Sequence, residues 1–325
     1  MTQPDASLAS HLRERFPHGL TAILAVGGTR TYYILEKRRG IENPGRLDDL
    51  SGYGVEVLRK TRDLIAMFLE LGVQHIIIPQ LSYQTFENSR GAAYAEATAR
   101  LALELLGDEF SRFYEDANID PYFTGIDTLL KYPEREVSYR VASACLRFQE
   151  NWSYQPGRHK LIWEVAPIPL YSIWRAHEIM GEEASAQLEA DIENAPSLQV
   201  VHDTLYRYYS QALYGTELPL PDFYLGSNRN GDIKLRSMLP IAMLCGSPTR
   251  FYFTPYSTMF MTREAAQEIM EDLAYGKGLR SSEIDYKDRL TPEFVEQEYQ
   301  RIMNLSQDPR TTIGLVGRRD AIGDE

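Results

Sequence analysis

Short apolar runs alternate along the chain with longer segments whose apolar residues recur every three or four positions. Runs of the first kind are typical of buried parallel strands, and segments of the second kind are typical of amphipathic helices. Six apolar runs predict strands at 21–26, 75–79, 121–125, 160–165, 222–227 and 250–254. Helices are predicted between and after them at 54–71, 91–106, 134–150, 170–190, 197–214, 262–275 and 291–304. This alternation predicts an α/β protein with a central, mostly parallel six-stranded sheet flanked by helices.

A single domain accounts for most of the chain. We expect a catalytic domain at 18–290, preceded by an N-terminal extension at 1–17 and followed by a C-terminal helix and tail, 291–325, that pack on it. A long polar stretch, about residues 30–53, separates the first strand from its helix. Ligands of parallel sheets bind beyond the carboxyl ends of strands, so we expect the site in the segments that follow the strands.

Composition and charge narrow the class of protein. The chain has 325 residues, 43% of them hydrophobic and 25% charged, as expected for a globular protein, and its formal net charge of -12 argues against a nucleic-acid polymer as partner. No apolar run approaches the ~18–20 residues of a membrane-spanning helix. The first ten residues lack the pattern of a signal peptide, so we expect a cytoplasmic protein. Cys145 and Cys245 are too few for a disulfide scaffold or a thiolate zinc site.

Several common catalytic motifs are absent from the sequence. No GxGxxG follows a predicted strand, and neither a Walker A motif nor a GxSxG nucleophile motif occurs. The six histidines are scattered, and none belongs to an HExxH motif. The sequence therefore gives no support to a dehydrogenase, a kinase, an ordinary hydrolase or a metalloprotease.

Two predicted strands end in segments that suit a ligand. The first strand leads into Gly27-Gly28-Thr29-Arg30, where glycines allow backbone N–H groups to turn toward a ligand and the guanidinium is a bidentate phosphate donor. An ordinary turn explains the same residues. The second strand leads into LSYQTFENSR, residues 81–90, which by composition alone is a polar loop that caps the next helix.

In this order, the segments resemble the start of a cis-prenyltransferase of the undecaprenyl diphosphate synthase kind. In that family the first strand ends in an Asp-Gly-Asn-Arg-Arg-type loop and the second in a Phe-Ser-Thr-Glu-Asn-Trp-x-Arg-type segment. PDFYLGS at 221–227 and RFYFTPY at 250–256 resemble the family's Pro-Asp-Leu-x-Ile-Arg and Glu-Leu-Tyr-Phe-Thr strands. The resemblance spans about residues 18–290, and no single motif is intact.

The sequence is more similar to a branch of diterpene synthases on this fold, which includes isotuberculosinol synthase (tuberculosinyl adenosine transferase) and kolavelol synthase. The shared features are GGTRTYY at 27–33, Tyr53 followed six residues later by Arg59, FYFTPYSTMFMT at 251–262 and TTIGLVG at 311–317. The resemblance implies removal of diphosphate from a bicyclic C20 prenyl diphosphate. The allylic cation then reacts with water, loses a proton or is captured by a nucleophile such as adenosine. A homodimer is implied by the wider family.

Two carboxylates of the family pattern are missing. Gly27 stands where the first loop has its metal-binding Asp, and Arg250 stands where a Glu precedes Leu-Tyr-Phe-Thr. We therefore expect no protein-held metal and no other cofactor, and any Mg²⁺ that takes part would enter only on the substrate's diphosphate. We favour arginines, Arg30 and Arg250 together with Arg236, and backbone N–H groups in place of the ion. The alternatives are a catalytically silent prenyl-diphosphate-binding subunit and a true chain-elongating cis-prenyltransferase, which would handle two diphosphates without these carboxylates.

The resemblance and the positions of the segments yield a set of candidate residues. Those expected to bind diphosphate are Gly27, Gly28, Thr29, Arg30, Asn88, Arg90, Arg236 and Arg250. Those expected to act in catalysis are Arg30, Tyr33 and Tyr53, the tyrosines because an aromatic face stabilises a cation. Those expected to line the substrate pocket are Tyr32, Met67, Phe68, Ser82, Phe86, Tyr94, Tyr252 and Tyr256. For most of the aromatic residues, packing in the core is an equally simple explanation.

Overall fold

The structure is a computed structural model that describes residues 6–37, 50–86, 92–134, 136–227, 235–236, 249–276 and 291–307. Its centre is a six-stranded sheet in the order β3-β4-β2-β1-β5-β6, in which every pair of neighbouring strands is parallel. The strands are β1 (Leu20–Leu24), β2 (Val73–Pro79), β3 (Ile119–Thr124), β4 (His159–Glu164), β5 (Phe223–Ser227) and β6 (Arg250–Thr254). The predicted fold class is confirmed, because all six predicted strands form within a few residues of their expected bounds.

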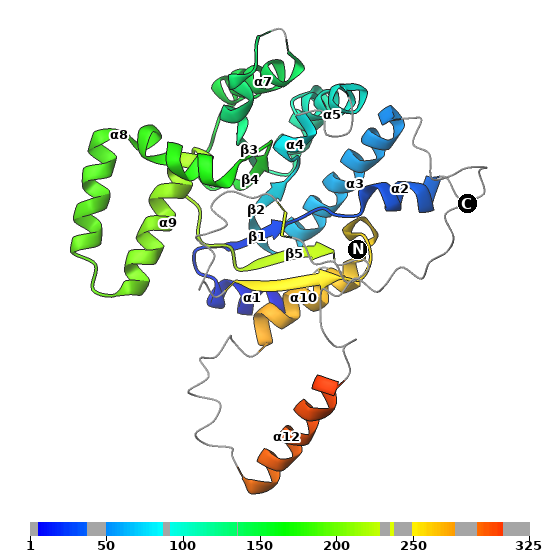
Figure 1. Cartoon of the computed structure of the whole chain (residues 1–325), viewed down its shortest axis with the longest axis vertical. Coiled ribbons are helices and arrows are strands. Elements are labelled where there is room, and N and C mark those ends of the chain that lie inside the picture. Colours follow the sequence, from blue (N-terminus) through cyan, green and yellow to red (C-terminus); the bar gives the residue numbers. More distant parts are fainter. Residues whose placement is uncertain are drawn as a thin grey trace.

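Helices connect and cover these strands (Figure 1). They are α1 (Ala6–Arg15), α2 (Thr29–Lys37), α3 (Leu50–Glu70), α4 (Tyr83–Phe86), α5 (Ala92–Glu104), α6 (Asp108–Asp116), α7 (Val137–Asn151), α8 (Pro169–Glu193), α9 (Leu198–Tyr214), α10 (Arg263–Tyr275) and α12 (Pro292–Gln307). Two short 3-10 helices are η1 (Ile126–Lys131) and η4 (Thr258–Phe260). No helix in the described part of the chain is both long and apolar enough to cross a membrane.

Two apolar layers hold the helices against the sheet. On one face, α1, α3, α5, α6, α7 and α10 bury side chains against alternate strand residues such as Ala22, Ile76 and Trp163. On the other face, α8 and α9 cover the intervening residues, Ile23, Ile77 and Ile162. Since strand side chains alternate between faces, burial on both sides explains the near-continuous apolar runs of the sequence.

Four α-helices in the described part of the chain were not predicted: α1, α2, the single turn α4, and α6. Helix α1 lies in the expected N-terminal extension, where Leu8 and Leu12 are part of the main core. Helix α2 occupies the start of the stretch expected to be polar and irregular, and α6 follows directly after α5. The described side chains of α12 are all exposed, whereas the sequence led us to expect this helix to pack on the domain. In Figure 1 it lies away from the sheet.

Candidate functional site

The turn that follows β1 is fixed by hydroxyl groups of the segment after β6. The backbone N–H of Gly27 donates to Thr258 Oγ1 at 3.0 Å, and Ser257 Oγ donates to the carbonyl oxygen of Gly27 at 2.7 Å. Gly28 has a φ of +69°, and a Cβ there would lie 2.9 Å from the Cβ of Ser257, so the position requires glycine. The N–H of Gly27, which we expected to turn toward a phosphate, is thus hydrogen-bonded to a side chain of the protein in this structure.

Helix α2 begins directly after this turn. The N–H of Tyr32 donates to the carbonyl oxygen of Gly28 at 2.9 Å, which closes the first helical turn. Thr29 and the exposed Arg30 therefore lie at the amino end of a helix rather than in an extended loop. The amino end of a helix carries a partial positive charge and favours anions, to which the guanidinium adds a full charge.

A second guanidinium lies beside the glycine turn. A Cβ placed on Gly27 would lie 3.2 Å from Nη2 of Arg236 and 2.5 Å from Oγ of Ser227, the last residue of β5. The backbone N–H of Arg236 donates to the hydroxyl of Tyr224 in β5 at 3.2 Å, which anchors this residue at the carboxyl edge of the sheet. Arg236 is therefore brought next to Gly27, as predicted, and Ser227 is a neighbour that the sequence reasoning missed. A hydroxyl at the last position of a predicted strand was its only signal.

Tyrosines tie α2 to α3 close to this point. The hydroxyl of Tyr53 lies 2.6 Å from Oγ1 of Thr29, and the rings of Tyr33 and Tyr53 meet edge to face with centroids 5.5 Å apart. Three of the predicted site residues, from two helices, are thus in contact. Of these, Thr29 and Tyr53 present hydroxyl groups beside the amino end of α2.

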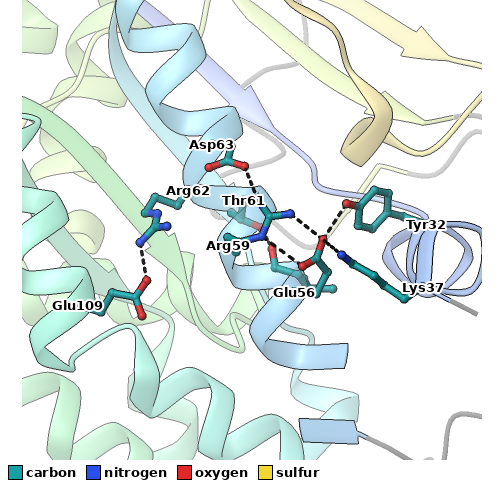
Figure 2. A network of polar contacts seen from close by, with 9 residues as sticks. Tyr32, Lys37, Glu56, Arg59, Thr61, Arg62, Asp63 and Glu109 are labelled. Carbon is teal, nitrogen blue, oxygen red and sulfur yellow. Dashed lines mark hydrogen bonds and ion pairs between the residues drawn. The ribbon is translucent and has the colours of Figure 1, made fainter. Parts of the chain in front are cut away.

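A polar network continues from Tyr32 into α3 (Figure 2). The hydroxyl of Tyr32 donates to Oε1 of Glu56 at 2.8 Å, Arg59 donates to both oxygens of Glu56 at 2.7 and 3.2 Å, and Lys37 lies 3.8 Å away. Hydrogen bonding from Arg59 lowers the pKa of Glu56, while burial and the nearby carboxylate raise the pKa of Tyr32. Tyr32, which is 3% exposed, is thus an anchor between helices and not a pocket wall.

Arg250, predicted to bind diphosphate, and Tyr252, predicted to line the pocket, contact α10 instead. Arg250 is the first residue of β6, so it lies at the amino edge, about 13 Å along the strand from Thr254 at the carboxyl edge. It donates to the carbonyl and carboxylate oxygens of Asp272 at 2.8 and 2.5 Å, and Tyr252 also donates to this carboxylate. The structure therefore does not bring Arg250 together with Arg30 and Arg236. Its role here is to join β6 to α10.

The remaining predicted pocket residues divide between core and surface. Phe68 and Phe86 are buried in the main core, where the ring of Phe68 lies 5.9 Å from that of Phe223, and Met67 packs against the same core. Ser82 and Tyr94 are half-buried, and Tyr256 is exposed at the surface. Asn88 and Arg90 lie outside the described residues.

The donor groups at the glycine turn do not fit Mg²⁺. This ion prefers carboxylate and phosphate oxygens in an octahedral shell. The direction in which an aspartate at residue 27 would point is filled by a hydroxyl and a guanidinium. Within the described ranges, no three His, Cys, Asp or Glu side chains form a cluster able to hold a metal ion. The groups that the structure places at this turn are hydrogen-bond donors and a positive charge, which suit an anion better than a metal cation.

Comparison with known proteins agrees with this architecture. By sequence, the chain matches no protein-family model and no curated protein. By structure, it is similar to lavandulyl diphosphate synthase from Lavandula x intermedia, solved in complex with dimethylallyl diphosphate, with a TM-score of 0.52 and 17% identity over 80% of this chain and 97% of that chain. The chain has the fold of that synthase. A probable undecaprenyl diphosphate synthase from Campylobacter jejuni matches at a TM-score of 0.46 and 14% identity, covering 80% of this chain and 97% of that one.

Proposed function

We propose that the chain is a diterpene synthase that removes diphosphate from a bicyclic C20 prenyl diphosphate of the tuberculosinyl or kolavenyl type. The observation that carries the proposal is the guanidinium of Arg236 beside Gly27, on the same sheet edge as Arg30 and the amino end of α2. The synthase with the same fold was solved with a prenyl diphosphate bound. The sequence motifs that resemble the diterpene synthase branch supply the C20 substrate class.

In the proposed reaction, the bond between the allylic carbon and the diphosphate oxygen breaks, and both electrons of that bond leave on the diphosphate. Arg30, Arg236 and the amino end of α2 stabilise the negative charge that develops on the leaving group. Water then adds to the allylic cation and releases a proton to solvent, which gives an alcohol. Loss of a proton from carbon gives an alkene instead, and another nucleophile in place of water gives a transfer product.

Tyr33 and Tyr53, the two aromatic residues predicted to act in catalysis, lie at the amino end of α2 and on α3 beside it. Their hydroxyl and ring contacts hold α2 against α3, and the Tyr53 hydroxyl bonded to Thr29 is placed to orient a water molecule or a diphosphate oxygen. We propose that Tyr53 serves in this way and that Tyr33 supports it. A carbocation close to an aromatic face gains ~1–2 kcal/mol or more when water is excluded.

The test is incubation of the purified full-length chain with tuberculosinyl, halimadienyl and kolavenyl diphosphates, in Mg²⁺ and in EDTA. We expect diphosphate release and a diterpene product by gas chromatography with mass spectrometry, with the rate retained in EDTA. Loss of one such leaving-group donor in Arg30→Ala or Arg236→Ala should lower kcat by ~10²–10³. If none of these substrates is consumed faster than in buffer without the protein, the proposal is rejected.

Two other outcomes would select the alternatives. Tight binding of these diphosphates without turnover indicates a silent binding subunit, for which the missing carboxylates at Gly27 and Arg250 are the argument. Longer prenyl products formed with isopentenyl diphosphate indicate chain elongation. Elongation is the less favoured of the two, because the site offers donors for one diphosphate and no carboxylates for metal ions.

A further inference from the structure

An apolar cavity of about 290 Å³ lies beyond the carboxyl ends of β2, β3 and β4. Its walls come from three separate connections: α4 after β2, η1 after β3, and the start of α8 after β4. The side chains that give it an apolar and aromatic lining are Tyr83, Leu129, Tyr132, Ile168 and Tyr171. Two larger cavities, of about 1020 and 740 Å³, open near the amino ends of the strands, away from the glycine turn.

The walls of this cavity are fixed by close backbone contacts. Gly125, after β3, has a φ of +72°, and a Cβ there would lie 2.7 Å from the backbone nitrogen of Pro167, so the connections after β3 and β4 touch. The hydroxyl of Thr128 lies 3.0 Å from the carbonyl oxygens of both Gly125 and Ala166. Ala166 itself has a φ of +101°, a left-handed conformation that a non-glycine residue adopts only where its surroundings impose it. Strain of this kind concentrates at functional sites, which makes the cavity a candidate for one.

The cavity lies on the same sheet edge as the glycine turn. Strand β2 is the direct neighbour of β1, and β4 is the next strand beyond it. At about 4.8 Å between neighbouring strands, the end of β4 is roughly 10 Å from the end of β1. A hydrocarbon attached to a diphosphate at Arg236 therefore reaches the cavity by crossing the end of β2.

Exposed apolar side chains lie on α8 next to the lining residue Tyr171. Leu170 and Trp174, on the first turns of α8, are 78% and 61% exposed, and the Trp174 ring lies 5.6 Å from that of Tyr171. Lys131 places its ammonium group 5.0 Å from the face of the Tyr171 ring. Large exposed apolar residues close to an apolar cavity are typical of a site for a hydrophobic ligand.

We propose that this cavity holds the hydrocarbon end of the substrate whose diphosphate binds between Arg236 and the amino end of α2. The inference rests on the proposed function and adds to it the side chains that select the prenyl group. Ile168 and Leu129 are then residues that determine specificity, since they are the aliphatic side chains of the lining. Their effect falls on the affinity for the hydrocarbon and not on the affinity for diphosphate.

The test is isothermal titration calorimetry of the full-length chain with three probes: inorganic pyrophosphate, dimethylallyl thiolodiphosphate and geranylgeranyl thiolodiphosphate. We expect the C20 probe to bind at least tenfold more tightly than the C5 probe. Ile168→Trp fills the cavity and should remove most of that difference while pyrophosphate binds as before, which also shows that the variant is folded. The matched control is Ile179→Trp, on the exposed side of the same helix, which should bind all three probes as the wild type does.

The outcomes separate the two proposals. If Ile168→Trp weakens binding of the C20 probe but no bicyclic substrate is turned over, the cavity assignment stands and the proposed function is overturned. If a bicyclic substrate is turned over but Ile168→Trp binds the C20 probe as tightly as the wild type does, only the cavity assignment is overturned. Binding of none of the probes overturns both. As an independent readout, the fluorescence emission of Trp174 should shift to shorter wavelength when the C20 probe binds. A shift that persists in Trp174→Phe would contradict the placement of the hydrocarbon beside Trp174.

Discussion

Glu56 joins α2 to α3 through hydrogen bonds that its neutral amide analogue does not reproduce. The carboxylate accepts from the Tyr32 hydroxyl at 2.8 Å and from Arg59 at 2.7 and 3.2 Å. Glu56→Gln removes the charge and replaces one acceptor oxygen by an N–H₂ group, which faces Nε of Arg59 when the amide oxygen keeps the bonds from Tyr32 and Nη2 of Arg59. We expect this substitution to destabilise the fold and to loosen the helix that begins at Thr29.

The magnitude follows from the burial of the groups. A hydrogen bond to a charged group contributes about 1.5–3 kcal/mol, and a buried hydroxyl left without a partner costs about 1–3 kcal/mol. Tyr32 is buried, whereas the side chain of Arg59 is 42% exposed and can turn to water. Most of the loss therefore comes from the buried bond to Tyr32, which changes from a hydrogen bond to a charged acceptor to one with a neutral acceptor, together with the donor of Arg59 left facing an N–H₂ group; we expect about 2 kcal/mol for Glu56→Gln.

The assay is urea unfolding followed by circular dichroism, with Asp63→Asn as the matched control. Asp63 also bonds to Arg59, at 3.1 Å, but its side chain is 47% exposed, and an exposed pair of this kind contributes about 0–1 kcal/mol. In Tyr32→Phe the hydroxyl is absent, so adding Glu56→Gln should cost less than it does in the wild type. An unfolding free energy for Glu56→Gln within about 0.5 kcal/mol of the wild type would refute the reasoning.

The same carboxylate has a defined pH dependence. The pKa of Glu56 is lowered in the folded state, with the hydrogen bond from Arg59 as the largest cause. Its contribution to stability is therefore fully present above the pKa of the unfolded chain and is lost as the pH falls toward the folded-state pKa. Glu56→Gln should therefore lose less of its unfolding free energy than the wild type does when the pH is lowered. An identical decrease in both proteins would contradict a lowered pKa for Glu56.

Three further predictions concern the glycine turn and the amino edge. Gly27→Asp should lose activity without gaining Mg²⁺ dependence, because its carboxylate meets Ser227 and Arg236; the measurement is kcat/KM with and without Mg²⁺. Arg236→Ala should lower kcat by ~10²–10³, whereas Arg250→Ala should lower the unfolding free energy and change kcat little. Burial lowers the pKa of His75 to about 4, so the unfolded chain binds the proton first. Stability should then fall by up to ~3 kcal/mol from pH 7 to 4, and His75→Phe should remove that slope in urea unfolding.

The strands were predictable because each is buried on both faces, so its apolar run stands out from its surroundings. Helix α2 was not predictable in this way. Its first residues follow two glycines, a signal for a turn, and its helical state depends on contacts distant in sequence, such as the Tyr32 ring 5.0 Å from Phe260 and the Tyr33 ring against Tyr53. Helix α6 has a short apolar face, with Phe110 and Tyr114 buried, which is a weak periodic signal.

For the site, the parallel sheet was a better guide than the motif resemblance. Arg250 stands at the start of a predicted strand, and in a parallel sheet the start of a strand lies opposite the ligand edge. This rule alone places Arg250 at the amino edge, where the structure has it, whereas the resemblance grouped it with the diphosphate ligands. Arg236 follows a strand end, and there the two lines of reasoning agree with the structure.

The glycine at position 27 and the guanidinium of Arg236 are best understood as one feature. A carboxylate at residue 27 would stand within contact distance of Arg236 and would neutralise it, because the two groups would share one space at the end of β1. With glycine there, the positive charge of Arg236 faces the edge where Arg30 and the amino end of α2 also lie. On the proposed function, this positive charge takes the place of the metal-binding side chain that the family resemblance implies, and the diphosphate binds there with no metal ion between it and the protein. For this reason, the missing aspartate is by itself no argument for a silent subunit.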